Sequence, residues 1–384
     1  MTRKKESHPK PRLLFASFDL FPSVKGASQH IAADLEVLER LFDVTLFSLR
    51  NRPGIEVTYR GTVRHIRVGL QVPNYLERAL AFRGALRQFL SEESFETAYF
   101  RSPWEGAVLV EHIPRTYFEV NALPSIELPY HFPDLNRNER LIEKIRREEQ
   151  EVLERSERII CVSSVTERFL RRRGVRKEIA VVPNGFDTEL FFHQKEKFEK
   201  KTLIYTGTLS PWQGVDFLLT SLRNPLRTRS DCQLILAVSG NKRFVRAYEV
   251  LARRLKLREH IRFEKNLEPY QAAALVRKSH IGLACLRRGR RNEEQGCSPI
   301  KILEYLGAGL PVAAPDLPVV REIVPEGTEL YRPERKRSFL ALVERLLEEP
   351  AESRKRRIRA EYAAKHFSKK RYAARLEHVL LCDR

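Results

Sequence analysis

One segment in the second half of the chain combines residue types suited to a phosphate-bearing ligand. Residues 296–301 read Gly-Cys-Ser-Pro-Ile-Lys and lead into an apolar helical pattern that contains Glu304. Ser298 is a favoured N-cap and Pro299 suits the first helical position, so we predict a helix that begins beside Ser298. The unpaired amides and partial positive charge of such a helix end attract anions. A diphosphate could lie there beside Lys301, with Glu304 accepting hydrogen bonds from sugar hydroxyls. A well-capped core helix with incidental charges would show the same pattern, and the segment alone leaves both interpretations open.

The elements that must position this segment follow an alternating pattern. Short apolar runs alternate with amphipathic helical stretches, which is typical of βαβ units around a parallel sheet. The predicted strands are Arg12–Phe18, Val44–Ser48, Val63–Val68, Thr97–Arg101, Thr116–Val120, Arg158–Val162, Ile179–Val182, Thr202–Thr206, Gln233–Val238, Ile261–Glu264, Ile281–Leu286 and Pro311–Ala314. The predicted helices include Ser28–Leu41, Asn74–Ser91, Asn138–Arg155, Val215–Leu222, Phe244–Leu257, Tyr270–Lys278 and Ile300–Gly307.

The alternating pattern restarts near residue 190, after a short charged stretch that we interpret as a linker. We therefore predict an α/β fold with two Rossmann-like, doubly wound parallel-sheet domains at residues 11–188 and 200–360. A basic helix at residues 361–384 would follow and could pack back on the first domain. Facing lobes of this kind direct the carboxyl ends of both sets of strands toward one central cleft, where such sheets bind ligands.

Composition limits the class of protein and its partners. The 384 residues are 42% apolar, which excludes intrinsic disorder for most of the chain. The net charge is +20, divided as +3 over residues 1–190 and +17 over the remainder. The five cysteines show no spacing for a zinc site or a disulfide framework, so we expect reduced thiols, a cytoplasmic location and no metal. No apolar run reaches the length that spans a bilayer.

Several motifs resemble one known family when they are taken together and in order. They are Pro22-Ser23-Val24-Lys25-Gly26-Ala27-Ser28, Cys161-Val162-Ser163-Ser164, Val182-Pro183-Asn184-Gly185-Phe186-Asp187, Tyr205-Thr206-Gly207-Thr208-Leu209-Ser210-Pro211-Trp212-Gln213-Gly214, Ala237-Val238-Ser239-Gly240 and the segment from Gln295 to Ala314. This set resembles the family 4 retaining glycosyltransferases of the GT-B fold, of the type that builds bacterial cell-envelope glycans. The resemblance implies a nucleotide-sugar donor bound without a cofactor or metal. The donor-binding residues that it implies are Gly26, Ala27, Gly207, Thr208, Gln213, Gly240, Asn292, Gln295, Gly296, Cys297, Ser298, Pro299, Ile300, Lys301 and Glu304.

The sequence also departs from the pattern of that family. The first glutamate of the family's Glu-x7-Glu pair falls on Gly296, and the basic residues that hold the donor diphosphate align with Thr208 and Gln213. Asn121 stands where a histidine is common. We expect the nearby Arg287, Arg288, Arg290 and Arg291 to supply the missing positive charge, since guanidinium groups pair well with phosphate oxygens. A solvated loop is the alternative for these arginines.

The remaining candidates lie in the first domain. Arg101, Glu119 and Asn121 lie at or just after the ends of predicted strands and are candidate catalytic residues. Glu127 and Tyr130 lie in a polar, aromatic segment that we predict to be a loop, and they are candidates for acceptor recognition. Each could equally serve the structure alone.

The resemblance thus implies an enzyme that transfers a sugar, with retention of configuration, from a nucleotide-diphosphate donor to a hydroxyl of a glycan or lipid-linked glycan. The alternative is a non-catalytic basic GT-B scaffold that binds nucleic acid or an anionic surface, although no specific nucleic-acid motif is present. A sugar-nucleotide isomerase would need acid–base carboxylates that cannot be placed. The stretch Asn74–Leu90 has apolar and basic sides, so it fits either a helix on an anionic membrane or one packed on its own sheet.

Overall fold

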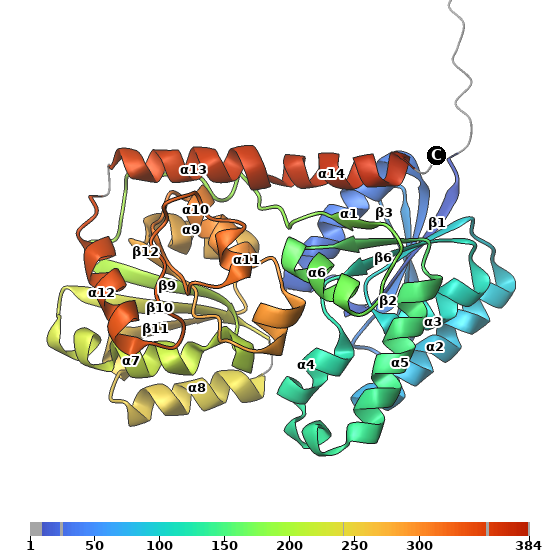
Figure 1. The fold of residues 1–384 in the computed structure, drawn as a ribbon, viewed down its shortest axis with the longest axis horizontal. Coiled ribbons are helices and arrows are strands. Elements are labelled where there is room, and N and C mark those ends of the chain that lie inside the picture. Colours follow the sequence, from blue (N-terminus) through green and yellow to red (C-terminus); the bar gives the residue numbers. More distant parts are fainter. Residues whose placement is uncertain (1–9, 24–25, 241, 351–352, 383–384) are drawn as a thin grey trace, which may run out of the picture.

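The computed structural model describes residues 10–23, 26–240, 242–350 and 353–382. The chain forms two α/β lobes side by side, each built around its own sheet (Figure 1). The last two helices run along one side of both lobes. The loop Pro22–Ser28 is described only in part, because Val24 and Lys25 lie outside these ranges.

The first lobe contains a mostly parallel sheet in the order β3-β4-β2-β1-β5-β6-β7-β8. Its strands are β1 (Arg12–Leu20), β2 (Asp43–Leu49), β3 (Gly54–Arg60), β4 (Val63–Gly69), β5 (Thr97–Phe100), β6 (Arg115–Val120), β7 (Arg158–Cys161) and β8 (Ile179–Val181). The edge strand β3 is antiparallel to β4. The strand β3 was not predicted, because its apolar residues Ile55, Val57 and Tyr59 face solvent rather than a core.

Helices cover both faces of this sheet. They are α1 (Gly26–Leu41), α2 (Tyr75–Glu92), α3 (Pro103–His112), α4 (Pro124–His131), α5 (Glu139–Arg155) and α6 (Ser164–Arg172), with a short turn η1 (Pro133–Arg137). The segment Ser125–His131, which we predicted to be a loop, forms most of α4. Pro124 starts this helix, where no amide donor is required, and Pro129 lies inside it, where the missing amide removes one helical hydrogen bond.

The amphipathic helix α2 packs on its own sheet. Phe82 and Leu86 are fully buried in the core of the first lobe. Arg83, from the basic side of this helix, is also buried, where it donates to the backbone oxygen of Trp104 at 2.8 Å and pairs with Glu148. Within the described parts of the chain, no helix combines the length and apolar character needed to cross a bilayer.

The second lobe contains a five-stranded parallel sheet in the order β11-β10-β9-β12-β13. Its strands are β9 (Lys201–Thr208), β10 (Cys232–Ser239), β11 (Ile261–Lys265), β12 (Ile281–Leu283) and β13 (Val312–Ala313). Its helices are α7 (Val215–Thr228), α8 (Lys242–Arg254), α9 (Pro269–Lys278), α10 (Ile300–Gly307), α11 (Pro318–Arg321) and α12 (Lys336–Leu347). Short turns η2 (Pro211–Gln213), η3 (Arg258–His260) and η4 (Arg290–Gln295) lie in its loops.

The C-terminal segment differs in detail from the single helix predicted for residues 361–384. Two helices form, α13 (Arg354–Phe367) over the second lobe and α14 (Lys369–Leu381) over the first (Figure 1). Ser368 separates them, since its hydroxyl accepts from the amide of Arg371 and caps α14. Tyr372, Leu376 and Leu380 then pack into the core between α14, α1 and the first sheet. The chain therefore crosses between the lobes twice, near residue 190 and at Ser368.

Gly307 shows how closely the linker packs on α10. A Cβ atom at this position would lie 2.2 Å from a ring carbon of Phe186, a buried residue just after the Pro-Asn-Gly motif. We expect Gly307→Ala to lower the free energy of unfolding by about 1–3 kcal/mol through overpacking, although alanine is the better helix former. The matched control is Gly84→Ala in α2, where a Cβ atom meets nothing within 4 Å, so the free energy should rise by about 0.5–1 kcal/mol. Urea denaturation measures both free energies of unfolding. A Gly307→Ala protein that is as stable as the Gly84→Ala protein would contradict close packing of Phe186 on α10.

Candidate functional site

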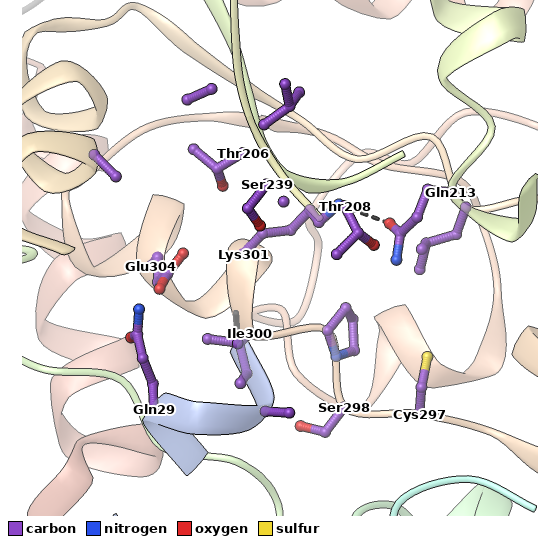
Figure 2. A pocket seen from close by; sticks show the side chains of 18 of the residues that line it. Gln29, Thr206, Thr208, Gln213, Ser239, Cys297, Ser298, Ile300, Lys301 and Glu304 are labelled. Carbon is purple, nitrogen blue, oxygen red and sulfur yellow. Dashed lines mark hydrogen bonds between the residues drawn. The ribbon is translucent and has the colours of Figure 1, made fainter. Parts of the chain in front are cut away.

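A cavity of about 390 Å³ lies between the lobes, at the carboxyl ends of strands from the second sheet. The second lobe supplies the loops after β9 and β10, the start of α9 and the start of α10. The first lobe supplies Gly26, Ala27 and Gln29 from the first turn of α1. Figure 2 shows Gln29 approaching from α1 while Lys301 and Glu304 approach from α10. The volume and position suit a small-molecule ligand.

The helix α10 begins at Ile300, as predicted, but its N-cap is Pro299 rather than Ser298. Ser298 has a different partner, because its hydroxyl accepts from the backbone amide of Asn184 at 3.2 Å. The side-chain amide of Asn184 in turn donates to the backbone oxygen of Ser298 at 2.8 Å. The linker between the lobes thus holds the loop before α10, and Pro299 takes the N-cap position without a side-chain hydrogen bond.

Lys301 and Glu304 bring opposite charges into this cavity. Lys301 Nζ donates to Gln213 Oε1 at 2.6 Å and lies 4.0 Å from the centre of the Tyr205 ring. Burial lowers the pKa of Lys301 to about 7. Burial also raises the pKa of Glu304 to about 7, against the opposing effect of Lys301. Both groups therefore change charge easily near neutral pH, which is frequent at functional sites.

Most of the donor-binding residues predicted from the sequence line the cavity. They are Gly26, Ala27, Gly207, Thr208, Gln213, Asn292, Cys297, Ser298, Pro299, Ile300, Lys301 and Glu304. Three others, Gly240, Gln295 and Gly296, are not among the lining residues. Gln295 is fully buried behind the loop, and a side chain at Gly296 would meet Ser163 and Thr166 of the first lobe.

The arginines after β12 do not all reach the cavity, which corrects our expectation for three of them. Arg287 pairs with Asp216 and Arg288 with Glu293, while Arg290 lies 3.7 Å from Glu294. Only Arg291 of this group lines the cavity. Its guanidinium donates to Glu127 at 2.6 Å and to the backbone oxygens of Gly296 and Asn121. Arg291 therefore connects the lobes as well as adding positive charge.

The acceptor-side candidates contact the opposite lobe. Glu127 on α4 is the carboxylate that pairs with Arg291. Tyr130 on the same helix meets Trp212 edge to face, with ring centroids 5.5 Å apart. The neighbouring His131 also lies against Trp212, at 5.2 Å. These contacts place α4 against the second lobe and next to the cavity, and the acceptor role itself stays a prediction.

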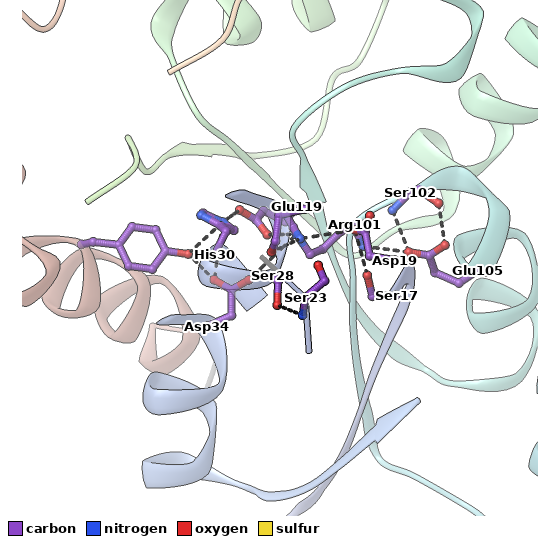
Figure 3. A network of polar contacts seen from close by, with 12 residues as sticks. Ser17, Asp19, Ser23, Ser28, His30, Asp34, Arg101, Ser102, Glu105 and Glu119 are labelled. Atoms are coloured by element: carbon purple, nitrogen blue, oxygen red, sulfur yellow. Dashed lines mark hydrogen bonds and ion pairs between the residues drawn. The ribbon is translucent and has the colours of Figure 1, made fainter. Parts of the chain in front are cut away.

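The catalytic candidates Arg101 and Glu119 belong to a buried ion-pair network that also includes residues of α1 (Figure 3). Arg101 Nε donates to Glu119 at 3.1 Å, and its Nη1 donates to the backbone oxygen of Ala27 at 3.3 Å. Glu119 also contacts His30, which lies 3.6 Å from Asp34. None of the candidates Arg101, Glu119 and Asn121 lines the cavity among the described residues.

Electrostatics explain why this network holds together. Burial alone would lower the pKa of His30, but the carboxylates of Asp34 and Glu119 raise it above its ordinary value. Burial alone would raise the pKa of Glu119, but His30 and Arg101 hold it well below its ordinary value. Tyr372 from α14 donates to Asp34, so the C-terminal helix also joins the network.

A histidine and two carboxylates at such short separations resemble a set of metal ligands. The guanidinium of Arg101, within 4.0 Å of Asp34 and 3.1 Å of Glu119, already neutralises the carboxylates and would repel a cation. We interpret the cluster as an ion-pair network that holds the first turn of α1, including Ala27, at the edge of the cavity.

Several lining residues were not predicted from the sequence. Ala237, Val238 and Ser239 end β10, and Leu267, Pro269 and Ala272 form an apolar wall around the start of α9. Ala237, Val238 and Ser239 belong to one of the motifs that resemble the family, whereas the residues around α9 were indicated only by their position, because ligands bind outside the carboxyl ends of strands in such sheets. Trp212 belongs to the motif from Tyr205 to Gly214, whereas Gln29 carried no comparable signal, since only the approach of the two lobes places it at the cavity.

The fold and the site define a class of protein. Two Rossmann-like lobes that face a shared cavity, with most of that cavity formed by the second lobe, make this a GT-B protein. The family described as Glycosyltransferase Family 4 matches residues 24–190, and the family described as Glycosyl transferases group 1 matches residues 186–366. The chain belongs to these family 4-like glycosyltransferases.

Solved structures show the same fold at low sequence identity. Sucrose-phosphate synthase from Thermosynechococcus elongatus has a TM-score of 0.78 at 16% identity, over 96% of this chain and 98% of that chain. HepE from Anabaena, solved with UDP and glucose, has a TM-score of 0.71 at 15% identity, over 97% and 100%. The catalytic domain of starch synthase IV from Arabidopsis thaliana, bound to ADP and acarbose, has a TM-score of 0.67 at 12% identity, over 96% and 98%. A search of curated protein sequences gives no match.

Proposed function

We propose that this glycosyltransferase moves a sugar from a nucleotide-diphosphate donor, bound in the cavity between the lobes, to an acceptor hydroxyl. The observation that carries the proposal is the arrangement of α10, whose N-terminus, Lys301 and Glu304 all face this cavity. The amides near Ser298 and Ile300 would hold the diphosphate, and the Glu304 carboxylate would accept from the ribose hydroxyls. Two structures of the same fold contain UDP or ADP, which supports this class of donor.

The arrangement also indicates how departure of the nucleotide diphosphate is assisted. Negative charge develops on the diphosphate as the bond to the sugar breaks, and fixed positive charge next to it lowers the barrier. The N-terminal end of α10, Lys301 and Arg291 provide such charge in the cavity. Gly26 and Ala27 approach from the first lobe and would shield the diphosphate from water. We assign no protein nucleophile.

The finer parts of the proposal concern stereochemistry, acceptor and location. The family resemblance supports retention of the anomeric configuration and an acceptor that is a glycan or lipid-linked glycan, as in cell-envelope synthesis. Glu127 and Tyr130, beside the cavity on α4, are the residues that we propose for acceptor recognition.

Exposed basic residues of α13, including Arg354, Lys355 and Arg357, support contact with an anionic membrane surface. Product analysis by NMR and flotation with anionic vesicles would test these parts separately.

The central test is a panel of nucleotides and nucleotide sugars in a thermal-shift assay, followed by measurement of donor hydrolysis. One base should raise the melting temperature by several degrees at millimolar concentration, and its diphosphate should act more strongly than its nucleoside. The alternative function, a basic scaffold without catalysis, predicts no shift with any nucleotide but salt-sensitive binding of RNA or anionic vesicles. The cavity favours the enzyme, because a scaffold of that kind would not need both Lys301 and Glu304 in the cavity lining.

A further inference from the structure

Lys301 is a lysine whose whole side chain lies inside the protein, although it belongs to the first turn of a helix that faces a cavity. Its exposed fraction is 9%, and its ammonium group reaches across the cavity wall from α10 to the loop after β9. There it donates to Gln213 and lies over the ring of Tyr205. Gly207 makes room for it, since a Cβ atom at that position would lie 3.2 Å from Lys301 Nζ.

The Lys301 ammonium has neutral partners where a buried cation normally has a carboxylate. The hydrogen bond to Gln213 and the face of Tyr205 compensate the charge only in part. The titratable groups that face it are Tyr205 on β9, Cys285 after β12, Cys297 before α10 and Glu304 on α10. Burial outweighs their effect and lowers the pKa of Lys301 to about 7. An anion in the cavity would therefore supply the negatively charged partner that the Lys301 ammonium lacks.

Other positions around this loop are uncharged or already paired. Thr208 and Gln213 carry no charge, and they lie on the β9 side of the cavity. Arg291 and Lys301 are the basic side chains among the described residues that line the cavity. Arg291 is held by Glu127 and two backbone oxygens, so Lys301 is the cation in this lining without a carboxylate hydrogen-bonded to it.

We propose that Lys301 is the residue that recognises the diphosphate of the donor, and that the ligand's second phosphate keeps its ammonium group protonated. This inference rests on the proposed function and names a specificity-determining residue within it. The proton comes from solvent and is retained on Nζ while the diphosphate is bound, and apart from this N–H bond no covalent bond changes. In the free protein the same group loses its proton as the pH rises above about 7. The preference for a nucleoside diphosphate over the corresponding monophosphate should therefore depend on both Lys301 and pH.

The experiment measures dissociation constants of UMP and UDP by calorimetry, with AMP and ADP as the pair if the panel selects adenine. The ratio of the two constants removes the contribution of Glu304 and the ribose, which both ligands share. In the native protein UDP should bind at least 10-fold tighter than UMP at pH 7, and this advantage should fall as the pH rises toward 9. Lys301→Met should reduce the advantage to 3-fold or less, while UMP binding stays within 3-fold of the native value.

Two further variants separate charge from shape. Lys301→Arg should restore most of the advantage and remove its dependence on pH, because a guanidinium stays protonated in this range. Lys278→Met, at an exposed lysine of the same lobe that pairs with Glu196, should change nothing. The inference is overturned if the native protein prefers UDP equally at pH 7 and 9, or if Lys301→Met keeps the full preference. Absence of binding by every nucleotide in the native protein would instead overturn the proposed function and this inference with it.

Discussion

Replacement of Glu304 by alanine is expected to weaken binding of the donor nucleotide by about 30- to 1000-fold, equivalent to about 2–4 kcal/mol. The reason is that a carboxylate accepting from two ribose hydroxyls makes two charge-assisted hydrogen bonds, and alanine makes neither. Glu304 lines the cavity from α10, and burial raises its pKa to about 7. Calorimetry with the nucleotide selected by the panel measures the loss at pH 8, where the carboxylate is ionised. Turnover of the donor should fall in parallel.

Glu329→Ala provides the matched control for this substitution. Glu329 is an exposed carboxylate of the same lobe, paired at 2.8 Å with Arg345 and absent from the cavity lining. Its removal should leave nucleotide affinity within 2-fold of the native value and should change stability by less than about 1 kcal/mol. Native-like affinity in Glu304→Ala, with its fold intact by circular dichroism, would refute the ribose-binding role.

Replacement of Glu119 by alanine is expected to lower the free energy of unfolding by about 3–5 kcal/mol. Glu119 is 2% exposed and pairs with both Arg101 and His30. Its removal leaves these two buried basic groups with Asp34 as the one remaining carboxylate, among the described residues, that lies close to both of them. The loss also reaches the site, because Arg101 holds the backbone oxygen of Ala27 at the edge of the cavity. Urea denaturation at pH 7 measures the stability, and donor turnover below the native level should accompany it.

The pH dependence of this effect has a definite sign. The pKa of Glu119 is lower in the folded protein than its ordinary value near 4.3, so its stabilising contribution is complete above about pH 4.3 and is lost as the pH falls below that value. The difference in stability between the native protein and Glu119→Gln should therefore shrink between pH 4.3 and pH 2. Glu157→Gln, at an exposed carboxylate 3.9 Å from Arg115, should cost less than about 1 kcal/mol at any pH. A Glu119 variant as mild as this control would refute the network.

The two predictions concern opposite sides of one cavity. Glu304 belongs to the second lobe and faces the cavity directly, whereas Glu119 belongs to the first lobe and acts through Arg101 and Ala27. Tyr372 of α14 reaches the same network through Asp34. The C-terminal helix therefore contributes to the position of α1, although its own residues stay outside the cavity lining. The helix α14, which crosses back to the first lobe, thus helps to hold the network that positions Ala27 at the edge of the cavity.

Local sequence patterns were sufficient for most of the architecture. Strands buried on both faces are nearly continuous apolar runs, so β1, β2 and β9 were predicted to within two residues at each end. The exposed edge strand β3 and the Pro-containing helix α4 escaped prediction because neither has the usual hydrophobic periodicity. Residue types around α10 also indicated an anion site, since a Gly-x-Ser-Pro sequence before an apolar helix favours an open helix start.

The sequence by itself thus determined two α/β lobes, their boundary near residue 190 and a segment from Cys297 to Glu304 that contributes residues to the cavity lining. Only the tertiary structure decided which basic side chains lie at the cavity beside that segment. Arg287, Arg288 and Arg290 are close in sequence, yet acidic neighbours hold them. Lys301 instead reaches Gln213, 88 residues earlier in the chain. The physical reason is that ion pairing depends on distances in space, and the crossings of the sheets and lobes set those distances.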